Sequence, residues 1–352
     1  MQDLKTLRDN FKKELELASI GKESSIPYIK VNLPKINSAT PSEYQVMVLG
    51  GTNFSSAVVK RSGSDIELYD VKKEKFSKFE SAKDLFSFIF KYIDFSIDLV
   101  CLNFAFPMEP VLRDLRIDGI LKSVPKDHRF TELIGLKIGE ELEKYINEKE
   151  GKKIKFSVAN DSICLLMAGI SVSDKRNIVG GILGTGFNIG IFHDEFTAVN
   201  TEAACFDKFE PSRALLAFDK DTLNPGQHLF EKEISGNYLY KHFNFLIEDK
   251  KINHRPVNST QELFAIARGG AEDESIIKVA NEIFKRSAQY LAAVYAGVAE
   301  FKNMDIDIVT QGAMFTDFYK EILMDEVEKL TDKRIMLYKI NDSSRLGAAL
   351  LI

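Results

Sequence analysis

Apolar residues alternate with polar ones, or form short apolar runs, over several stretches of the first half of the chain. Such stretches are typical of half-buried or fully buried β-strands. They predict strands at residues 43–51, 54–62, 64–73, 98–107 and 153–161. Helical spacing of Leu4, Leu7, Phe11 and Leu15 instead predicts an amphipathic first helix. Two further helices are predicted at residues 80–93 and 131–151, the second capped by Thr131 and ended by Gly151.

The second half of the chain repeats this order. It predicts strands at residues 177–186, 187–194 and 196–204, a helix at 273–303, a strand at 305–312, a helix at 315–330, a strand at 334–340 and a short helix from Ser344. In both halves a glycine-threonine turn, at residues 50–52 and 184–186, joins the first two strands. The repeat predicts a duplicated α/β architecture of two lobes that face each other around a cleft.

The lobes predicted from this pattern are a smaller one at residues 42–160 and a larger one at 1–41 and 161–352. The terminal helix, from about residue 344, can pack back on the smaller lobe. We expect the two glycine-threonine turns to face each other across the cleft.

Composition narrows the class of protein. The 352 residues carry a net charge of -5, with basic and acidic residues interleaved, so the chain does not look like a nucleic-acid-binding protein. We expect no membrane span and no signal peptide, because charges interrupt every long apolar window, and we therefore expect a cytoplasmic protein. The three cysteines are widely separated and are expected to be buried free thiols. The five histidines lack metal-ligand spacing, so no protein-built metal site is expected.

Either glycine-threonine turn alone could be an ordinary tight hairpin. At equivalent places in two similar halves, however, the turns suit a polyphosphate, which backbone N–H groups and threonine hydroxyls can bind. The candidate phosphate-binding residues are Gly50, Gly51, Thr52, Asn53, Gly184, Thr185 and Gly186.

Polar side chains also follow the predicted strands. Asn160 and Asp161 end one apolar strand, and Asn188 and Glu202 lie in the second half. A strand-end aspartate is commonly an N-cap for the following helix. Alternatively, it is a general base that takes the proton of a hydroxyl as that hydroxyl attacks a γ-phosphate.

Longer motifs resemble those of the hexokinase family. They run in the family's order: "LGGTNF" (49–54), "LNFAFP" (102–107), "DGILKSVPKDHRFTELIG" (118–135), "VANDS" (158–162), "GILGTGFN" (181–188), "NTEAACFD" (200–207), "NPGQHLFEKEISGNYL" (224–239) and "SRLGAALL" (344–351). The motif at 224–239 is the most specific, and the match runs from about Ser24 to the end of the chain.

The resemblance implies the duplicated actin-like ATPase (ribonuclease H-like) fold, and it implies a role for each matched residue. Asp161 would be the catalytic base, and Lys126, Asn160, Asn188 and Glu202 would bind sugar hydroxyls. The two turns would hold the phosphates, while Gly312 and Ser344 would approach the nucleotide from its adenosine end. The implied ligands are a sugar and ATP, with Mg²⁺ held mainly through the nucleotide, in a monomer or homodimer.

Several residues depart from the family's pattern. Val48 stands where the family has the aspartate that helps hold hydrated Mg²⁺, and Ser55 replaces an arginine. Ala105, Pro125 and Lys241 stand in place of sugar-binding serine, threonine and glutamate, while Gln311 and Ala313 replace an aspartate and a threonine.

The sequence favours an ATP-dependent kinase of a hexose's primary hydroxyl. The departures leave two other hypotheses: a catalytically weakened or silent homologue that senses sugar or nucleotide, and a kinase for a different sugar derivative. Lys241 would suit a sugar with an anionic substituent.

Overall fold

The computed structural model describes residues 3–34, 41–50, 53–63, 65–124, 128–269 and 273–352. The chain forms two compact units. Unit 1 comprises Met1–Tyr28, Gly181–Ile189 and Thr201–Lys339, and unit 2 comprises Ile29–Gly180, Gly190–Asn200 and Ile340–Ile352. The predicted lobe boundaries stay a prediction.

Unit 2 is built on a five-stranded sheet of order β4-β3-β2-β5-β8. The strands are β2 (Glu43–Leu49), β3 (Asn53–Ser62), β4 (Asp65–Lys75), β5 (Leu99–Phe104) and β8 (Lys155–Ala159). The first three pair antiparallel, whereas β2, β5 and β8 run parallel. The predicted hairpin is therefore present, since β2 and β3 pair up to Leu49 and Phe54.

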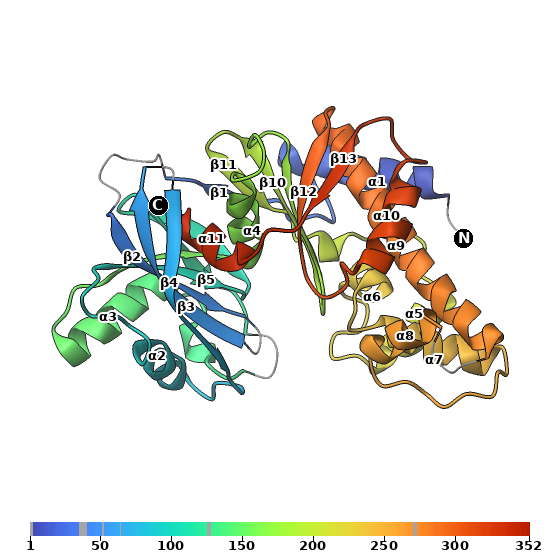
Figure 1. The fold of residues 1–352 in the computed structure, drawn as a ribbon, viewed down its shortest axis with the longest axis horizontal. Helices are drawn as coiled ribbons and strands as arrows, with labels where there is room; N and C mark the ends of the chain where they lie inside the picture. The colour runs from blue at the N-terminus through green and yellow to red at the C-terminus, as the bar shows by residue number, and fades with distance from the viewer. Residues whose placement is uncertain (1–2, 35–40, 51–52, 64, 125–127, 270–272) are drawn as a thin grey trace. The chain divides into compact units, whose positions relative to one another are not determined.

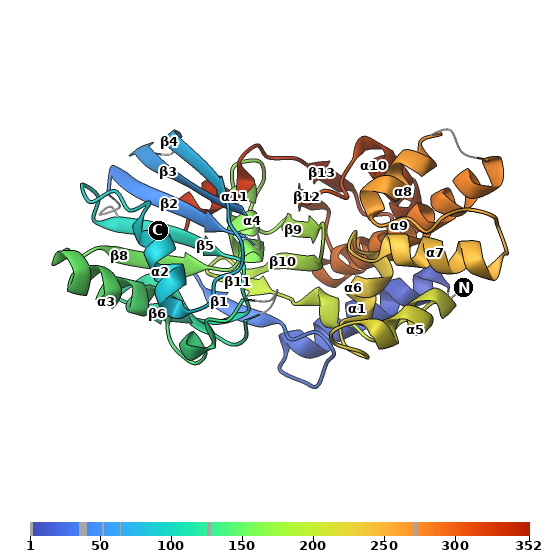
Figure 2. The same cartoon turned by 90° about the horizontal axis from the view of Figure 1, so that it is seen from below.

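One face of this sheet packs against α2 (Ala82–Phe90) and α3 (Ile138–Glu150), as Figures 1 and 2 show. The core between them is rich in aromatic and aliphatic residues, including Phe104, Phe156 and Leu142, all fully buried. Burial of these side chains is what fixes the strand register, because a one-residue slip would turn them to the opposite face.

The opposite face of the sheet packs against α11 (Ser343–Ala349), which also lies against α4 (Asp161–Gly169). The Tyr44 hydroxyl donates to the carbonyl oxygen of Ala349 at 2.8 Å. A Cβ on Gly347 would lie 1.7 Å from the carbonyl oxygen of Cys164, so only glycine permits this approach of α11 to α4.

The start of α3 in unit 2 differs from the prediction. Thr131 does not cap α3: residues Thr131–Leu133 form a 3-10 turn, and α3 begins at Ile138. The buried Asp118 carboxylate accepts instead from the backbone N–H groups of Gly139 and Glu140, at 2.8 and 3.1 Å. The end of α3 is as predicted, with Gly151 left-handed at φ 65°.

Short strands of unit 2 were also missed. β6 (Met108–Arg113) and β7 (Arg116–Leu121) form a two-stranded hairpin, and β1 (Ile29–Asn32) pairs antiparallel with β11 (Thr197–Asn200). β1 lies within a polar stretch and β6 contains Pro110, so neither gave a strand pattern.

Unit 1 is mainly helical and is organised around the long helix α9 (Glu274–Lys302), orange in Figure 1. The other helices are α1 (Leu4–Ser19), α5 (Arg213–Phe218), α6 (Leu229–Ile234), α7 (Leu239–Asp249), α8 (Thr260–Ala267) and α10 (Asp317–Val327). α1, α7, α8 and α10 all pack on α9. The strands β12 (Ile306–Gln311) and β13 (Ile335–Tyr338) pair in parallel.

β9 (Ile178–Leu183) and β10 (Phe187–Asp194) complete a six-stranded sheet of order β1-β11-β10-β9-β12-β13. The chain passes from one unit to the other within these two strands. Each half of the sequence thus gives three successive strands before its helices and remaining strands, in the predicted order.

Candidate functional site

The first turn of α4 holds Asn160 and Asp161 at the carboxyl end of β8. Asn160 is the N-cap: its side-chain oxygen accepts from the backbone N–H and the hydroxyl of Ser162, at 2.9 and 2.8 Å. Asp161 is the first helical residue, and its Oδ1 accepts from the same N–H at 2.9 Å. The capping role considered for Asp161 is therefore filled by its neighbour. Burial, together with the Asp161 charge, raises the pKa of the Cys164 thiol well above its ordinary value.

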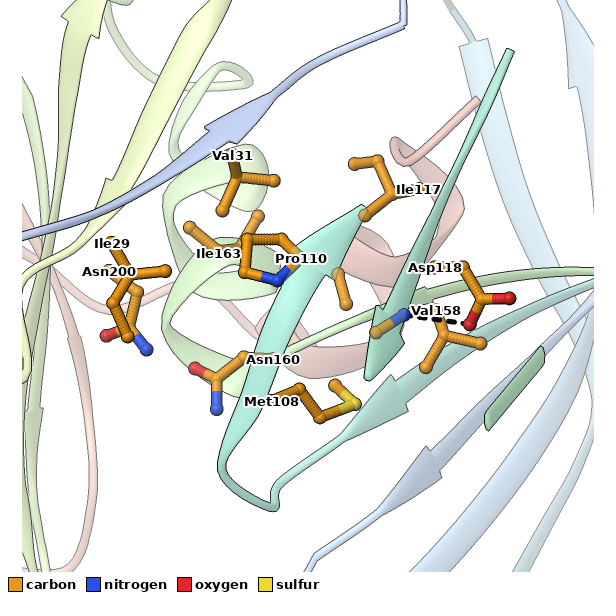
Figure 3. Close-up of a pocket in the computed structure, with 12 residues that line it drawn as sticks. Ile29, Val31, Met108, Pro110, Ile117, Asp118, Val158, Asn160, Ile163 and Asn200 are labelled. Carbon is orange, nitrogen blue, oxygen red and sulfur yellow. Dashed lines mark hydrogen bonds between the residues drawn. The ribbon is translucent and has the colours of Figure 1, made fainter. Parts of the chain in front are cut away.

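A small pocket of unit 2, of about 20 Å³, adjoins Asn160. Figure 3 shows Asn160 and Asn200 at one end of the pocket, with Asp118 at the other. Between them the lining is apolar, with Met108, Ile163 and other aliphatic side chains. The pocket thus has room for a single small group, about the size of a methyl or a water, beside two carboxamides.

The second glycine-threonine turn, in unit 1, is enclosed by residues of the motif at 224–239. Its carbonyl oxygens accept hydrogen bonds: Gly184 from the Gly236 N–H at 2.7 Å, and Thr185 from the Ser235 hydroxyl at 3.1 Å. The carboxylate of Glu231 accepts from the Phe187 N–H at 2.9 Å. These hydrogen bonds hold the carbonyl groups of Gly184 and Thr185 and so fix the backbone conformation of the turn.

A larger hollow of about 540 Å³ lies beside this turn in unit 1. Its walls are the turn itself, α8 and the segment after β12, and its lining comprises Gly184, Thr185, Gly236, Ser259, Thr260, Gln261, Phe264, Arg268, Ala313, Met314 and Thr316. Gly312 fixes the third wall: its φ is +123°, and a Cβ there would lie 2.1 Å from the Leu183 carbonyl oxygen. The volume and the glycine-rich end suit a nucleotide.

Asn188 and Glu202 come together within unit 1. The Asn188 side-chain oxygen accepts from the N–H of Ala203, the residue after Glu202, at 3.3 Å. Glu202 has a left-handed backbone, φ 52°, which is uncommon for a non-glycine residue and is often found at functional sites. Nearby, Cys205 Sγ lies 3.7 Å from His228 Nδ1. Burial and the charges of Glu202 and Glu231 raise the pKa of Cys205 to about 11.

The first glycine-threonine turn is only partly described. The Gly50 N–H donates to the Asn53 carbonyl oxygen at 2.9 Å, which closes the hairpin. Gly51, Thr52, Pro125 and Lys126 lie outside the described residues. Ser344 belongs to the same unit, in the first turn of α11.

The departures from the family pattern occupy distinct positions. Val48 is paired with Ser55 on β3 and with Asn103 on β5, so two of the departures are neighbours. The Ala105 N–H donates to the Leu49 carbonyl oxygen at 3.0 Å. Lys241 lies over the Tyr238 and Phe218 rings, with Nζ 5.6 and 5.7 Å from their centroids, a cation–π arrangement.

Three residues of these surroundings were missed in the sequence: Glu231, Asn103 and Asn200. Glu231 lies inside the recognised motif, so its contact with the second turn could have been sought. Asn103 and Asn200 are polar residues at strand ends, the same signal that selected Asn160.

The described residues contain no group of three or more His, Cys, Asp and Glu side chains able to hold a metal ion. They also include no helix that is both long and apolar enough to cross a membrane.

Comparison with known proteins identifies relatives over most of the chain. The hexokinase family model matches residues 240–352. Hexokinase-7 of Oryza sativa subsp. japonica is 24% identical over 404 residues, covering 91% of this chain and 86% of its own. The Schistosoma mansoni hexokinase is 25% identical over 407 residues, covering 94% and 88%.

Solved structures show the same fold. The S. mansoni hexokinase complexed with glucose superposes with a TM-score of 0.78 at 20% identity, covering 99% of this chain and 95% of its own. A ROK family glucokinase from Streptomyces griseus, in complex with glucose and AMPPNP, gives 0.57 at 15%, covering 87% and 98%. The predicted duplicated actin-like ATPase fold is confirmed. The match to the family model over residues 240–352 and the matches to relatives over nine-tenths of the sequence make the chain similar to hexokinases.

Proposed function

We propose that the protein transfers the γ-phosphate of ATP to the primary hydroxyl of a hexose, with Asp161 as the general base. The observation that carries the proposal is the placement of Asp161 at the start of α4, where Asn160 fills the N-cap. A carboxylate with this placement can accept a proton from an alcohol. The similarity of the chain to hexokinases supports phosphoryl transfer to a sugar as the reaction class.

In the proposed reaction, the Asp161 carboxylate takes the hydroxyl proton as the sugar oxygen attacks the γ-phosphorus, and ADP leaves. Asn160, Asn188 and Glu202 would hold sugar hydroxyls, together with Lys126. The hollow beside the second turn would hold the nucleotide, with its phosphates near Gly184 and Thr185 and its base toward α8.

Mg²⁺ would accompany the nucleotide and neutralise charge on its phosphates. The donor set of unit 2 fits a hydrated ion better than a directly bound one. Val48 offers no oxygen, but the buried Asn103 Oδ1 beside it has no hydrogen-bond partner among the described residues. Gly50, Asn53 and Ser344 are the other candidates of this unit for contacts with the nucleotide.

The test is a coupled assay of ADP formation across a panel of sugars, with Asp161→Ala beside the parent protein. Loss of a general base typically lowers the rate by about 10²–10⁴-fold. Sugar binding, followed by thermal shift, should be largely kept. Asp174→Ala is a matched control, because Asp174 is an exposed aspartate whose side chain is bonded locally to Arg176. Unchanged turnover in Asp161→Ala would refute the assigned role.

A second candidate function is supported by the pocket beside Asn160. Its apolar lining and two carboxamides suit a sugar with an N-acyl group, whose methyl would be buried and whose amide would pair with Asn160 or Asn200. The same sugar panel decides between these: N-acetylhexosamines preferred over glucose would favour this candidate. Sugar-induced stabilisation without any ADP formation would instead indicate a silent sensor.

A further inference from the structure

The side chain of Asn103 is a buried carboxamide whose oxygen has no hydrogen-bond partner among the described residues. The residue lies in β5, between the parallel strands β2 and β8, and only 1% of its surface is exposed. Its Nδ2 donates to the Ser344 carbonyl oxygen at a long 3.5 Å. Its Oδ1 is buried and accepts no hydrogen bond from the described residues. Because an unpaired buried acceptor is destabilising, a partner beyond the described residues is expected.

The position of Asn103 points to the side from which this partner comes. Asn103 pairs with Val48 on β2 and with Ala159 on β8, one residue before Asn160. Residues in register on neighbouring strands share a face, so the carboxamide lies between two apolar side chains near the carboxyl ends of three parallel strands. Ligands of open α/β sheets bind at this end. The first glycine-threonine turn begins two residues after Val48.

The missing partner must be a hydrogen-bond donor. Phosphate oxygens of a bound nucleotide lack hydrogens near neutral pH, so they cannot serve. A water bound to Mg²⁺ is a strong donor, because the ion withdraws electron density from it. Mg²⁺ also keeps several waters when bound through a nucleotide. One such water can reach a recessed oxygen that the ion itself does not contact.

We propose that Asn103 Oδ1 accepts a hydrogen bond from a water of the Mg²⁺ that accompanies the nucleotide. In this role Asn103 is a positioning residue, and it provides the polar group that Val48 does not. The inference rests on the proposed function, since it requires a bound Mg²⁺–nucleotide.

The test measures how much Mg²⁺ tightens the binding of a non-hydrolysable ATP analogue. The dissociation constant is determined by calorimetry with Mg²⁺ and with EDTA, and their ratio is compared between parent and Asn103→Leu. We expect the Mg²⁺ enhancement to fall by about tenfold, the size of a charge-assisted hydrogen bond. The melting temperature of the unliganded variant should be unchanged or higher, because Oδ1 loses no partner.

Asn244→Leu is the matched control. Both polar atoms of the Asn244 side chain bond to the Val257 backbone at 2.9 Å, so this variant should lose stability and keep the parent's Mg²⁺ enhancement. Asn103→Val repeats the measurement with a smaller residue that suits a strand and offers no acceptor. Adding Val48→Asp to Asn103→Leu should restore the Mg²⁺ enhancement. Residue 48 is paired with residue 103, so an aspartate there would offer a carboxylate oxygen on the same face of the sheet.

The outcomes separate the two proposals. A Mg²⁺ enhancement equal to the parent's in folded Asn103→Leu and Asn103→Val overturns the role of Asn103. A marked loss of stability in both variants also overturns it, because Oδ1 would then have a partner within the fold. Sugar-dependent ADP formation by the parent tests the proposed function independently of either result.

Discussion

Gly312→Ala is expected to damage both stability and nucleotide binding, for two separable reasons. The backbone of Gly312 has φ +123°, a region that residues with a Cβ rarely adopt. In addition, the new Cβ would lie 2.1 Å from the Leu183 carbonyl oxygen and 2.9 Å from the Gly184 nitrogen. Both neighbours are backbone atoms at the end of β9, so no side-chain rotation can relieve the overlap.

The magnitude follows from adding the two effects. Backbone strain of this kind costs about 1–3 kcal/mol, and overpacking of a close contact costs about 1–3 kcal/mol. Their sum, about 2–6 kcal/mol, is a large part of the roughly 5–15 kcal/mol by which proteins are stable. For a unit of this size, each kcal/mol lowers the melting temperature by about 2–4 °C.

The assay is thermal unfolding of the variant beside Gly151→Ala. Gly151 has φ +65° and no atom within 4 Å of the position of an added Cβ, so its variant carries strain without overlap. We expect Gly151→Ala to lose about 1–2 kcal/mol and Gly312→Ala to lose clearly more. Nucleotide affinity should fall only in Gly312→Ala, because the segment after Gly312 lines the hollow. Equal melting temperatures in the two variants would contradict the reasoning.

Three further predictions concern unit 1. Burial lowers the pKa of His242 from 6.5, so its neutral form is favoured in the fold. The unfolded chain then binds more protons, and stability should fall as pH drops below 6.5; His242→Gln should flatten this fall in urea unfolding. Cys205, with its pKa raised to about 11, should react slowly with iodoacetamide at pH 8 and faster as pH rises; Glu202→Gln should speed the labelling, and mass spectrometry measures both rates. Lys232, fully buried, donates to Asp219 and to the Asn224 carbonyl oxygen. Lys232→Met should cost about 3–5 kcal/mol in urea unfolding, because it leaves the Asp219 carboxylate without its cation; a loss below 1 kcal/mol would contradict that role.

The regular elements of the fold were predictable because their periodicity is strong. The helix predicted at 273–303 is α9, and the hairpin predicted around residues 50–52 is β2–β3. The start of α3 was not predictable from local pattern. The residue that serves its first N–H groups, Asp118, is remote in sequence, and a threonine at residue 131 gave a competing local signal.

The sequence predicted the segments that contribute to the candidate site, but not which of their residues are neighbours in space. The sequence indicated Asn160 and Asp161 as strand-end polar residues, and the structure assigns the N-cap to Asn160. It gave no sign that Val48 and Asn103 are neighbours, because strand pairing joins positions 55 residues apart. Contacts of that kind depend on tertiary register, which no local pattern encodes.

The position of Asp161 is set by α4, and close backbone contacts hold α4 without the β2 and β3 residues that depart from the hexokinase pattern. A Cβ on Gly347 would meet the Cys164 carbonyl oxygen at 1.7 Å, and one on Gly190 would meet that of Ser162 at 2.9 Å. Two glycines therefore let α11 and β10 approach α4 at its first turn. Since neither contact involves Val48 or Ser55, the loss of polar groups there leaves the support of Asp161 intact. The departures should consequently lower metal and phosphate binding more than they disturb the placement of Asp161, the proposed base.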